Sequence, residues 1–290
     1  MTPPTVPRLA IVTVSFGSEG VLPSILGSIP AAVTEPYRLV LVDNKPVEGS
    51  PVPGIAQTAG ADYLPLDNPG YGGAANRAVH LLDDSIEWVL VANPDVVFAE
   101  QAIDRLLAAA DTDEQIGSVG PAILTPDGEV YPSARAVPSL RTGVGHALLG
   151  GVWPGNPWTR RYRCSEGSDV RTRDAGWLSG ACVLVRRRVF EELGGFDTGY
   201  FMYFEDVDLG YRIGKAGYRN VYEPGAVVTH IGAHSTGGDA SAGMLRAHHA
   251  SARRFIDRKY HGAIMWPVRA VLHVGLEVRE GLLVRRGARR

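Results

Sequence analysis

The sequence is poor in cysteine and lacks any long apolar run. Its 290 residues include two cysteines, Cys164 and Cys182, too few for a disulfide framework or a four-cysteine zinc site, which favours a reducing compartment. No stretch of about 18 apolar residues is free of charge, so we expect no membrane-spanning helix. Residues 1–7 lack the cationic and then apolar character of a signal peptide. We therefore expect a cytoplasmic protein.

The charge is unevenly distributed along the chain. The net charge is −2, but residues 246–290 hold eleven Lys or Arg and three Asp or Glu, so the rest of the chain is acidic. A basic end on an acidic body indicates an anionic partner, such as lipid headgroups or nucleic acid. A solvated tail without a partner is the alternative.

Apolar periodicity predicts a chain in which strands and helices alternate. With 45% hydrophobic residues the composition is that of an ordinary globular protein. Alternation of this kind is typical of a Rossmann-like, mostly parallel sheet with helices on both faces. Strands are predicted over 9–16, 37–44, 63–66, 87–95, 117–124, 177–185, 218–222 and 226–230. Helices are predicted over 21–29, 71–82, 99–109, 186–193, 205–215 and 240–260, and the aperiodic stretch 131–174 is expected to be a loop.

Polar side chains follow the predicted strands where each one ends. Ser15 ends the first strand, Asp43 ends the second, and Asn93 and Asp95 follow the fourth. Ligands of such sheets bind beyond the carboxyl ends of the strands, and this placement favours a nucleotide-type ligand. Asp95 can present a carboxylate to a divalent metal on a diphosphate. The alternative is a plain turn, because Asn, Pro and Asp all form turns.

A glycine-rich segment follows the third predicted strand. Gly70, Gly72 and Ala75 fit the dinucleotide fingerprint G-x-G-x-x-A. That fingerprint belongs after the first strand, so we reject the match. The glycines still allow a helix N-terminus to approach a ligand closely.

Carboxylates and aromatic residues are concentrated between positions 194 and 212. Glu205, Asp206 and Asp208 begin a predicted helix directly after an aromatic run. A carboxylate in this position suits a general base, whereas the alternative is an acidic cluster that complements the helix dipole. His230 ends a predicted strand, where a histidine is usually structural but can also bind Mn²⁺.

The ordered set of these motifs resembles the inverting GT-A glycosyltransferases of family 2. The resemblance extends from residue 9 to about residue 235. The aromatic-rich form of the acidic motif looks most like bacterial rhamnosyltransferases. The segments that carry the resemblance are Val12–Ser15, Val42–Asn44, Asn68–Asn76, Asn93–Asp95, Trp177–Ala181, Phe204–Leu209 and His230.

The resemblance implies roles on the donor side. Asp43 is expected to bind the pyrimidine base, and Asp95 to bind a Mn²⁺ or Mg²⁺ ion on the donor diphosphate, with His230 as second ligand. Asn93 stands where many members have an aspartate, which implies weaker metal affinity. The remaining donor-binding candidates are Ser15, Asn68 and Gly72.

The resemblance also implies an acceptor side and a reaction. Asp206 is expected to be the catalytic base, with Trp177 and Glu205 beside the acceptor. The implied reaction moves a deoxysugar, L-rhamnose from dTDP-L-rhamnose, to N-acetylglucosamine on a polyprenyl diphosphate in cell-wall or polysaccharide assembly. Alternatives are a UDP-sugar donor, a nucleotidyltransferase on the same fold, and a non-catalytic membrane-bound scaffold.

The chain is expected to divide into a GT-A domain and a basic tail. The domain would occupy 1–239, with a donor half at about 8–125 and an acceptor half at about 126–239, and residues 240–290 would form a basic amphipathic helical segment. Its apolar face, Val268, Leu272 and Leu276, would lie on the inner face of the plasma membrane. The alternative is packing on the body or on a second copy, which would give a homo-oligomer. No nucleic-acid partner is expected.

Overall fold

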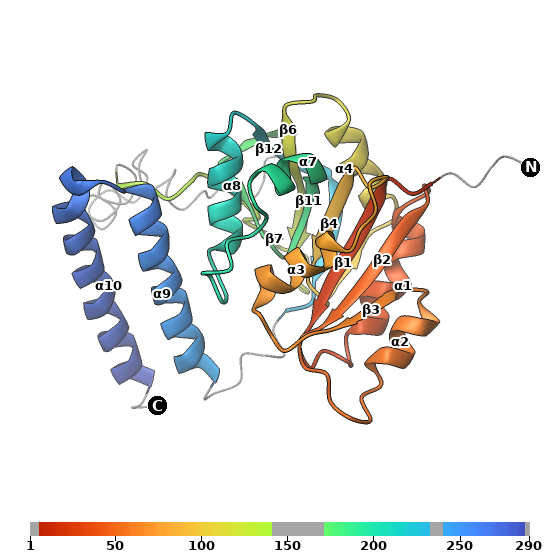
Figure 1. Ribbon diagram of the computed structural model, residues 1–290, viewed down its shortest axis with the longest axis horizontal. Helices are drawn as coiled ribbons and strands as arrows, with labels where there is room; N and C mark the ends of the chain where they lie inside the picture. Colours follow the sequence, from red (N-terminus) through yellow and green to blue (C-terminus); the bar gives the residue numbers. More distant parts are fainter. Residues whose placement is uncertain (1–5, 141–170, 233–239, 288–290) are drawn as a thin grey trace, which may run out of the picture.

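The computed structural model describes residues 6–140, 171–232 and 240–287 (Figure 1). Its central sheet has the strand order β3-β2-β1-β4-β11-β6-β12-β5. Strands β3, β2, β1 and β4 are mutually parallel, β11 is antiparallel to both of its neighbours, and β12 is parallel to β6. The strands are β1 (Leu9–Ser15), β2 (Tyr37–Asp43), β3 (Asp62–Pro65), β4 (Trp88–Ala92), β5 (Val96–Phe98), β6 (Ile116–Leu124), β11 (Cys182–Arg186) and β12 (Arg219–His230).

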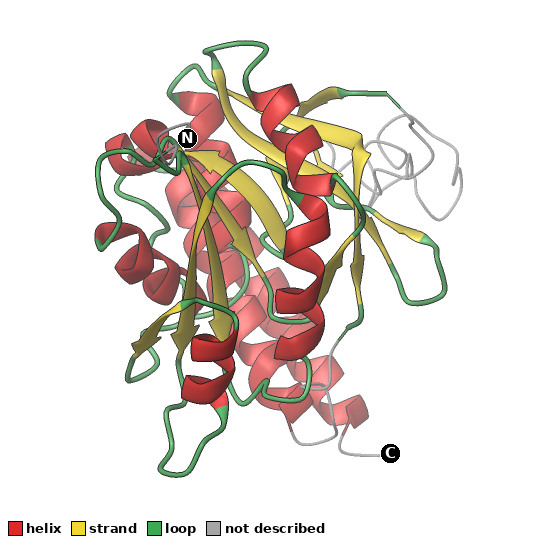
Figure 2. Ribbon diagram, turned by 90° about the vertical axis from the view of Figure 1, so that its right-hand side faces the viewer, coloured by secondary structure: helices red, strands yellow, loops and turns green. Residues whose placement is uncertain are grey.

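Helices cover both faces of this sheet, as the sequence predicts (Figure 2). One apolar core lies under α1 (Leu22–Ala32), α2 (Val52–Thr58) and α4 (Ala102–Ala110). The other lies under α3 (Tyr71–His80), α7 (Arg187–Glu192) and α8 (Glu205–Lys215). Strands β1 and β4 are buried throughout, which explains why they read as continuous apolar runs.

The predicted strand 177–185 is wrong, because two separate strands occupy it. β10 (Trp177–Leu178) pairs with β8 (Ala134–Arg135) in a small second sheet, and β11 begins at Cys182. In the turn between them, the backbone N–H groups do not bond to the main sheet. The Ser179 N–H group, for example, donates to Ser133 O at 2.7 Å. An apolar run hides such a break, since periodicity alone does not record where the backbone hydrogen bonds go.

Other boundaries also differ from the prediction. The strands predicted at 218–222 and 226–230 form one strand, β12, with an irregular register between Glu223 and Val227. Helix α1 continues through Pro30 to Ala32, since a proline in the last turn removes one hydrogen bond only. Helix α2 and the short strands β5, β7 (Val130–Tyr131) and β9 (Arg173–Ala175) were not predicted.

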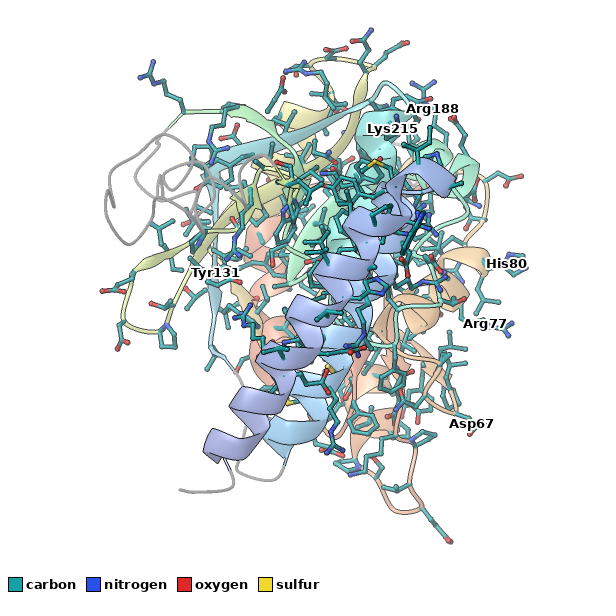
Figure 3. All side chains as sticks on the ribbon, turned by 90° about the vertical axis from the view of Figure 1, so that its left-hand side faces the viewer. Asp67, Arg77, His80, Tyr131, Arg188 and Lys215 are labelled. Atoms are coloured by element: carbon teal, nitrogen blue, oxygen red, sulfur yellow. The ribbon has the colours of Figure 1, made fainter. Side chains whose placement is uncertain are left out.

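The C-terminal helices form a hairpin beside α8 (Figures 1 and 3). It consists of α9 (Ala240–Lys259), the short 3-10 helix η1 (Ala263–Met265) and α10 (Trp266–Gly287). Phe255 of α9 is buried in an aromatic cluster with Trp177 and Tyr200. Helix α9 is therefore packed on the body. The domain boundary at residue 239 stays a prediction.

Helix α10 presents a different apolar face to solvent from the predicted one. The helix packs on α9, and the predicted face of Val268, Leu272 and Leu276 is half-buried. The exposed apolar residues of the hairpin are Ile264, Trp266, Val271, Val274 and Val278. No helix among the described residues is long and apolar enough to span a membrane.

Of the two cysteines, the structure describes one. Cys182 is a buried free thiol at the start of β11, and burial raises its pKa. Cys164 lies outside the described residues, as does most of the loop expected over 131–174. The predicted reducing compartment stays a prediction.

Close packing fixes α8 against β10. A Cβ atom on Gly210 would lie 2.6 Å from Trp177 Cβ and 2.7 Å from its Cα. Asn220 of β12 binds both elements, because its Nδ2 donates to Gly210 O at 3.0 Å and to Gly176 O at 3.2 Å. The absence of a side chain at Gly210 therefore sets the distance between helix and strand.

We predict that Gly210→Ala destabilises the fold by about 1–3 kcal/mol, the usual cost of overpacking. The matched control is Gly214→Ala, one turn later on α8, where an added Cβ meets nothing within 4 Å. The control substitution should raise the free energy of unfolding by up to about 1 kcal/mol, because alanine has a higher helix propensity than glycine. Urea unfolding of both variants checks this, and equal midpoints would contradict the packing assignment.

Candidate active site

Asp206 lies in the first turn of α8, and two backbone N–H groups hold its carboxylate. Gly180 N–H donates to Oδ2 at 2.9 Å and Val207 N–H donates to Oδ1 at 2.8 Å. The two residues before the helix, Tyr203 and Phe204, have left-handed backbone conformations with φ of 67° and 66°. Burial raises the pKa of Asp206, although its backbone hydrogen bonds oppose the rise. The arrangement gives a fixed, more basic carboxylate.

The turn that holds Asp206 also contacts the ends of the parallel strands. Asn93 N–H, just after β4, donates to Ala181 O at 2.9 Å. The Tyr71 hydroxyl, at the start of α3, donates to Gly180 O at 2.9 Å. Burial, followed by the nearby charges of Glu205 and of other carboxylates, raises the pKa of this phenol well above its usual value. Asp206 and the strand-end residues thus belong to one site.

Asp95 and His230 meet at the end of the sheet, as the sequence analysis expects. His230 Nε2 lies 3.0 Å from Asp95 Oδ1 and 3.4 Å from Asn93 Nδ2. The backbone supports this meeting, because Ile231 N–H donates to Asp95 O at 2.9 Å. Among the described residues, no group of three or more His, Cys, Asp or Glu side chains could hold a metal. A cation here would have two protein ligands of this kind.

The donor-side candidates of β1 and β2 are deeply buried. Ser15 pairs with Asp43 across the two strands, and they are 0% and 1% exposed. Asp43 Oδ2 accepts from the Tyr63 hydroxyl at 2.9 Å and Oδ1 accepts from Lys45 N–H at 3.0 Å. A carboxylate oxygen can accept a second hydrogen bond, so Asp43 keeps capacity for a base.

The glycine-rich segment accommodates an aromatic loop of the protein itself. A Cβ on Gly70 would lie 2.6 Å from Phe201 O, and one on Gly72 would lie 2.7 Å from Phe196 Cβ. Asn68 has a backbone φ of 45°, and its Oδ1 atom lies 3.4 Å from Nδ2 of Asn44. The glycines therefore bring the start of α3 against loop 194–204. Donor binding by Asn68 and Gly72 stays a prediction.

The two acceptor-side candidates are mostly buried. Trp177 donates through Nε1 to Ala136 O at 3.2 Å and packs in the aromatic cluster with Phe255. Glu205 is 8% exposed, and its Oε2 has no hydrogen-bond partner among the described residues. Burial and the Asp206 charge raise the pKa of Glu205 to about 8. Glu205 is therefore largely protonated at neutral pH.

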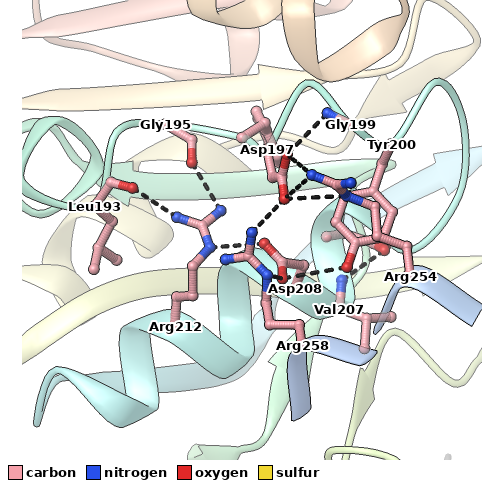
Figure 4. A network of polar contacts seen from close by, with 12 residues as sticks. Leu193, Gly195, Asp197, Gly199, Tyr200, Val207, Asp208, Arg212, Arg254 and Arg258 are labelled. Atoms are coloured by element: carbon pink, nitrogen blue, oxygen red, sulfur yellow. Dashed lines mark hydrogen bonds and ion pairs between the residues drawn. The ribbon is translucent and has the colours of Figure 1, made fainter. Parts of the chain in front are cut away.

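Asp208, the third carboxylate of the motif, is fully buried in an ion-pair network (Figure 4). Its oxygens lie 2.7 Å from Arg212 Nε and 3.0 Å from Arg258 Nε. Arg258 and Arg254 of α9 also pair with Asp197 in loop 194–204. The network ties helix α8, the loop 194–204 and the C-terminal hairpin together, which gives Asp208 a structural role.

Sequence reasoning missed two groups next to the predicted residues. Asn76 of α3 donates to Phe196 O at 2.8 Å and accepts from Phe196 N–H at 2.9 Å, and so holds the aromatic loop. Arg135 of β8 lies near Asp206 and opposes the rise in its pKa. Asn76 is the last residue of the motif Asn68–Asn76, so the sequence analysis could have identified it as a candidate residue. Arg135 lies in an aperiodic stretch that carries no signal.

Comparison with known proteins identifies the family of the chain. Residues 7–247 match the family described as glycosyltransferase-like family 2. The chain belongs to glycosyltransferase family 2. This glycosyltransferase is 44% identical, over 97% of its own length and 94% of the relative's, to N-acetylglucosaminyl-diphospho-decaprenol L-rhamnosyltransferase of Mycobacterium tuberculosis. It is 27% identical to rhamnosyltransferase WbbL of Escherichia coli, over 86% and 92% of the two chains.

Solved structures confirm the GT-A fold of the glycosyltransferase. Mannosyltransferase PcManGT from Pyrobaculum calidifontis, solved with GDP-Man and Mn²⁺, superposes with a TM-score of 0.55 at 19% identity, covering 98% of this chain and 74% of that one. GalNAc-T7, solved with UDP, GalNAc and Mn²⁺, gives 0.60 at 14% identity, covering 86% and 47%. At these identities the likeness concerns the fold alone.

We predict that Glu205 makes the enzyme less stable as the pH rises. Its pKa is about 8 in the folded state, against an ordinary value of 4.5. Between these values the folded state keeps a proton that the unfolded state has lost, so the free energy of unfolding falls with increasing pH. Glu205→Gln cannot titrate, and melting temperatures between pH 5 and about pH 8 should fall less steeply in this variant than in the wild type.

The control for this measurement is Glu100→Gln, at an exposed position, which should keep the wild-type slope. If Glu205→Gln and the wild type have the same slope, Glu205 is not a protonated buried acid.

Proposed function

We propose that the enzyme transfers L-rhamnose from dTDP-L-rhamnose to N-acetylglucosamine on a polyprenyl diphosphate, inverting the anomeric centre. The observation that carries this proposal is the 44% identity, over 97% of the chain, to the mycobacterial enzyme whose name states that acceptor and sugar. The reaction would take place at the cytoplasmic face of the membrane that holds the lipid. A UDP-sugar is the competing donor.

Asp206 would act as the general base. An acceptor hydroxyl is a poor nucleophile until its proton is removed, and Asp206 is the carboxylate that the Gly180 and Val207 N–H groups orient. As the hydroxyl oxygen attacks the anomeric carbon, its proton would pass to Asp206 and the nucleoside diphosphate would leave from the opposite face. Burial raises the pKa of Asp206, which makes its carboxylate a stronger base than that of an exposed aspartate.

The pair of Asp95 and His230 fits a divalent cation. Carboxylate oxygen and imidazole nitrogen are both ligands of Mn²⁺, and Mg²⁺ commonly uses one or two carboxylates together with phosphate oxygens. Their closest atoms are 3.0 Å apart, so one ion on the donor diphosphate could bind both. A bound ion would neutralise the charge that develops on the leaving diphosphate. The Asn93 side chain lies beside this pair, with its Nδ2 3.4 Å from His230 Nε2.

The buried Glu205 would face the acceptor as a neutral acid. A protonated carboxyl group donates one hydrogen bond and accepts others, and Glu205 Oε2 has no partner among the described residues. Keeping this neighbour neutral spares Asp206 a second negative charge beside it. Trp177 would border the acceptor through the rim of its indole ring, since most of the ring is buried.

The C-terminal hairpin would contact the membrane through its outward face. Ile264 and Trp266 are 93% and 62% exposed, and Val271, Val274 and Val278 continue the exposed apolar surface along α10. Tryptophan favours the membrane interface, and nearby arginines are attracted to anionic lipids. Self-association of two copies through the same face is the competing use of this surface.

We predict that Asp206→Asn lowers kcat by about 10²–10⁴-fold, the usual contribution of a general base. The kcat is measured from the transfer of labelled rhamnose from dTDP-L-rhamnose to a short-chain N-acetylglucosaminyl diphosphate lipid. UDP-sugars are tested as donors in the same assay. The dissociation constant for dTDP, measured by calorimetry, should stay near the wild-type value. The control is Asp62→Asn, because Asp62 is an exposed residue of β3 whose carboxylate pairs with Arg38 of β2.

Undiminished transfer by Asp206→Asn would exclude Asp206 as the base. If the wild-type enzyme transfers only from a UDP-sugar, the assigned donor is wrong while the assigned base stands.

A further inference from the structure

Arg135 lies one strand away from the segment that orients the catalytic base. It pairs with Trp177 in the small sheet of β8 and β10, and Gly176 N–H donates to its carbonyl oxygen at 2.8 Å. Strand β10 then enters the turn in which Gly180 binds Asp206. The position of Arg135 is thus coupled to the catalytic turn by backbone hydrogen bonds.

The guanidinium group of Arg135 is held in place by aromatic rings. Its Cζ lies 5.2 Å from the centroid of Tyr131 and 5.5 Å from that of Trp177, and Nε donates to Pro132 O at 2.7 Å. Figure 3 shows Tyr131 at the surface on one side of the hairpin, and Asp67 and Arg77 on the other. The group is therefore preorganised rather than free to move in solvent.

In the part of the chain that the structure describes, Arg135 forms no direct ion pair with a carboxylate, although its charge acts on Asp206. Other arginines near this site are paired with acids: Arg212 and Arg258 bind Asp208. Arg135 is half-buried, and a partly desolvated guanidinium gains from an anion that bonds to it directly. With Nε on Pro132 O, the terminal guanidinium nitrogens can bind an anionic ligand in the two-pronged geometry that phosphate favours.

The acceptor of the proposed function carries an anion close to its reacting hydroxyl. Its diphosphate is joined to the sugar whose hydroxyl must reach Asp206, so one sugar ring separates the two. The donor diphosphate belongs elsewhere, at Asp95 and His230 beyond β4 and β12. Arg135, on the acceptor half and near Asp206, suits the second diphosphate in position and in charge.

We propose that Arg135 binds the diphosphate of the lipid-linked acceptor and so selects diphosphate-linked sugars over neutral glycosides. This assignment rests on the proposed function, since it requires that acceptor. The aromatic pair would set the angle of the guanidinium, and the diphosphate would place the sugar hydroxyl at Asp206.

The test compares two acceptors in the full chain, a short-chain N-acetylglucosaminyl diphosphate lipid and a neutral alkyl N-acetylglucosaminide. We expect Arg135→Gln to raise KM for the diphosphate acceptor about 10- to 100-fold, as for a lost hydrogen bond to a charged group. The ratio of kcat/KM between the two acceptors should fall by the same factor. Arg135→Lys should fall between Arg135→Gln and the wild type.

A matched control is Arg186→Gln, at the far end of β11, where the guanidinium stacks on Trp88 at 4.2 Å. It should leave the acceptor ratio unchanged. An unchanged ratio in Arg135→Gln would overturn the assignment. Two other results would also overturn it. A loss of kcat with both acceptors together with a lower melting temperature would indicate a purely structural role. A shift in the acid limb of the pH profile, with no other change, would indicate that Arg135 only tunes Asp206.

The proposed function fails separately from this assignment. If the wild-type enzyme uses neither acceptor, the proposed function is wrong and the assignment falls with it. If the wild-type enzyme uses the diphosphate acceptor and Arg135→Gln does so with the same KM, only the assignment of Arg135 is wrong.

Discussion

The hydrogen bond from Gly180 N–H to the Asp206 carboxylate is the interaction on which the site depends. The turn that makes it also receives the Tyr71 hydroxyl and the Asn93 N–H. Helix α8, helix α3 and the end of β4 are therefore held around one short turn. Because β10 lies in the small second sheet and β11 begins only at Cys182, the Gly180 N–H group is available to Asp206 rather than to a neighbouring strand.

A second constraint comes from the C-terminal hairpin. Arg254 and Arg258 of α9 pair with Asp197 and Asp208, and so link the hairpin to the loop and the helix that form one side of the site. The buried centre of this network is the pair of Asp208 and Arg212, and removing one partner of a buried ion pair commonly costs about 3–5 kcal/mol. Some of the basic residues that were expected to bind an external anion, Arg254 and Arg258, therefore form ion pairs within the protein. A hairpin anchored in this way would connect membrane contact with acceptor placement.

Much of the fold could be predicted from the sequence, because buried parallel strands and amphipathic helices have clear periods. The meeting of Asp95 with His230 followed from their places at strand ends. The turn at Gly180 was missed because the apolar residues on both sides of it read as one strand, although the pair Ser179-Gly180 favours a turn. Arg135 was hidden for a different reason. It lies in the aperiodic stretch 131–174, and its contact with Trp177 joins residues far apart in the sequence, which no local pattern records.

The anomeric configuration of the product tests the proposed single displacement most directly. If Asp206 takes the proton of a hydroxyl that attacks opposite the leaving diphosphate, the glycoside formed must have the configuration opposite to that of the donor sugar. NMR of the product of wild-type transfer, through the one-bond coupling between C1 and H1, distinguishes the two configurations. Inversion is the predicted result. Retention would contradict it, because a single displacement opposite the leaving diphosphate cannot retain the anomeric configuration.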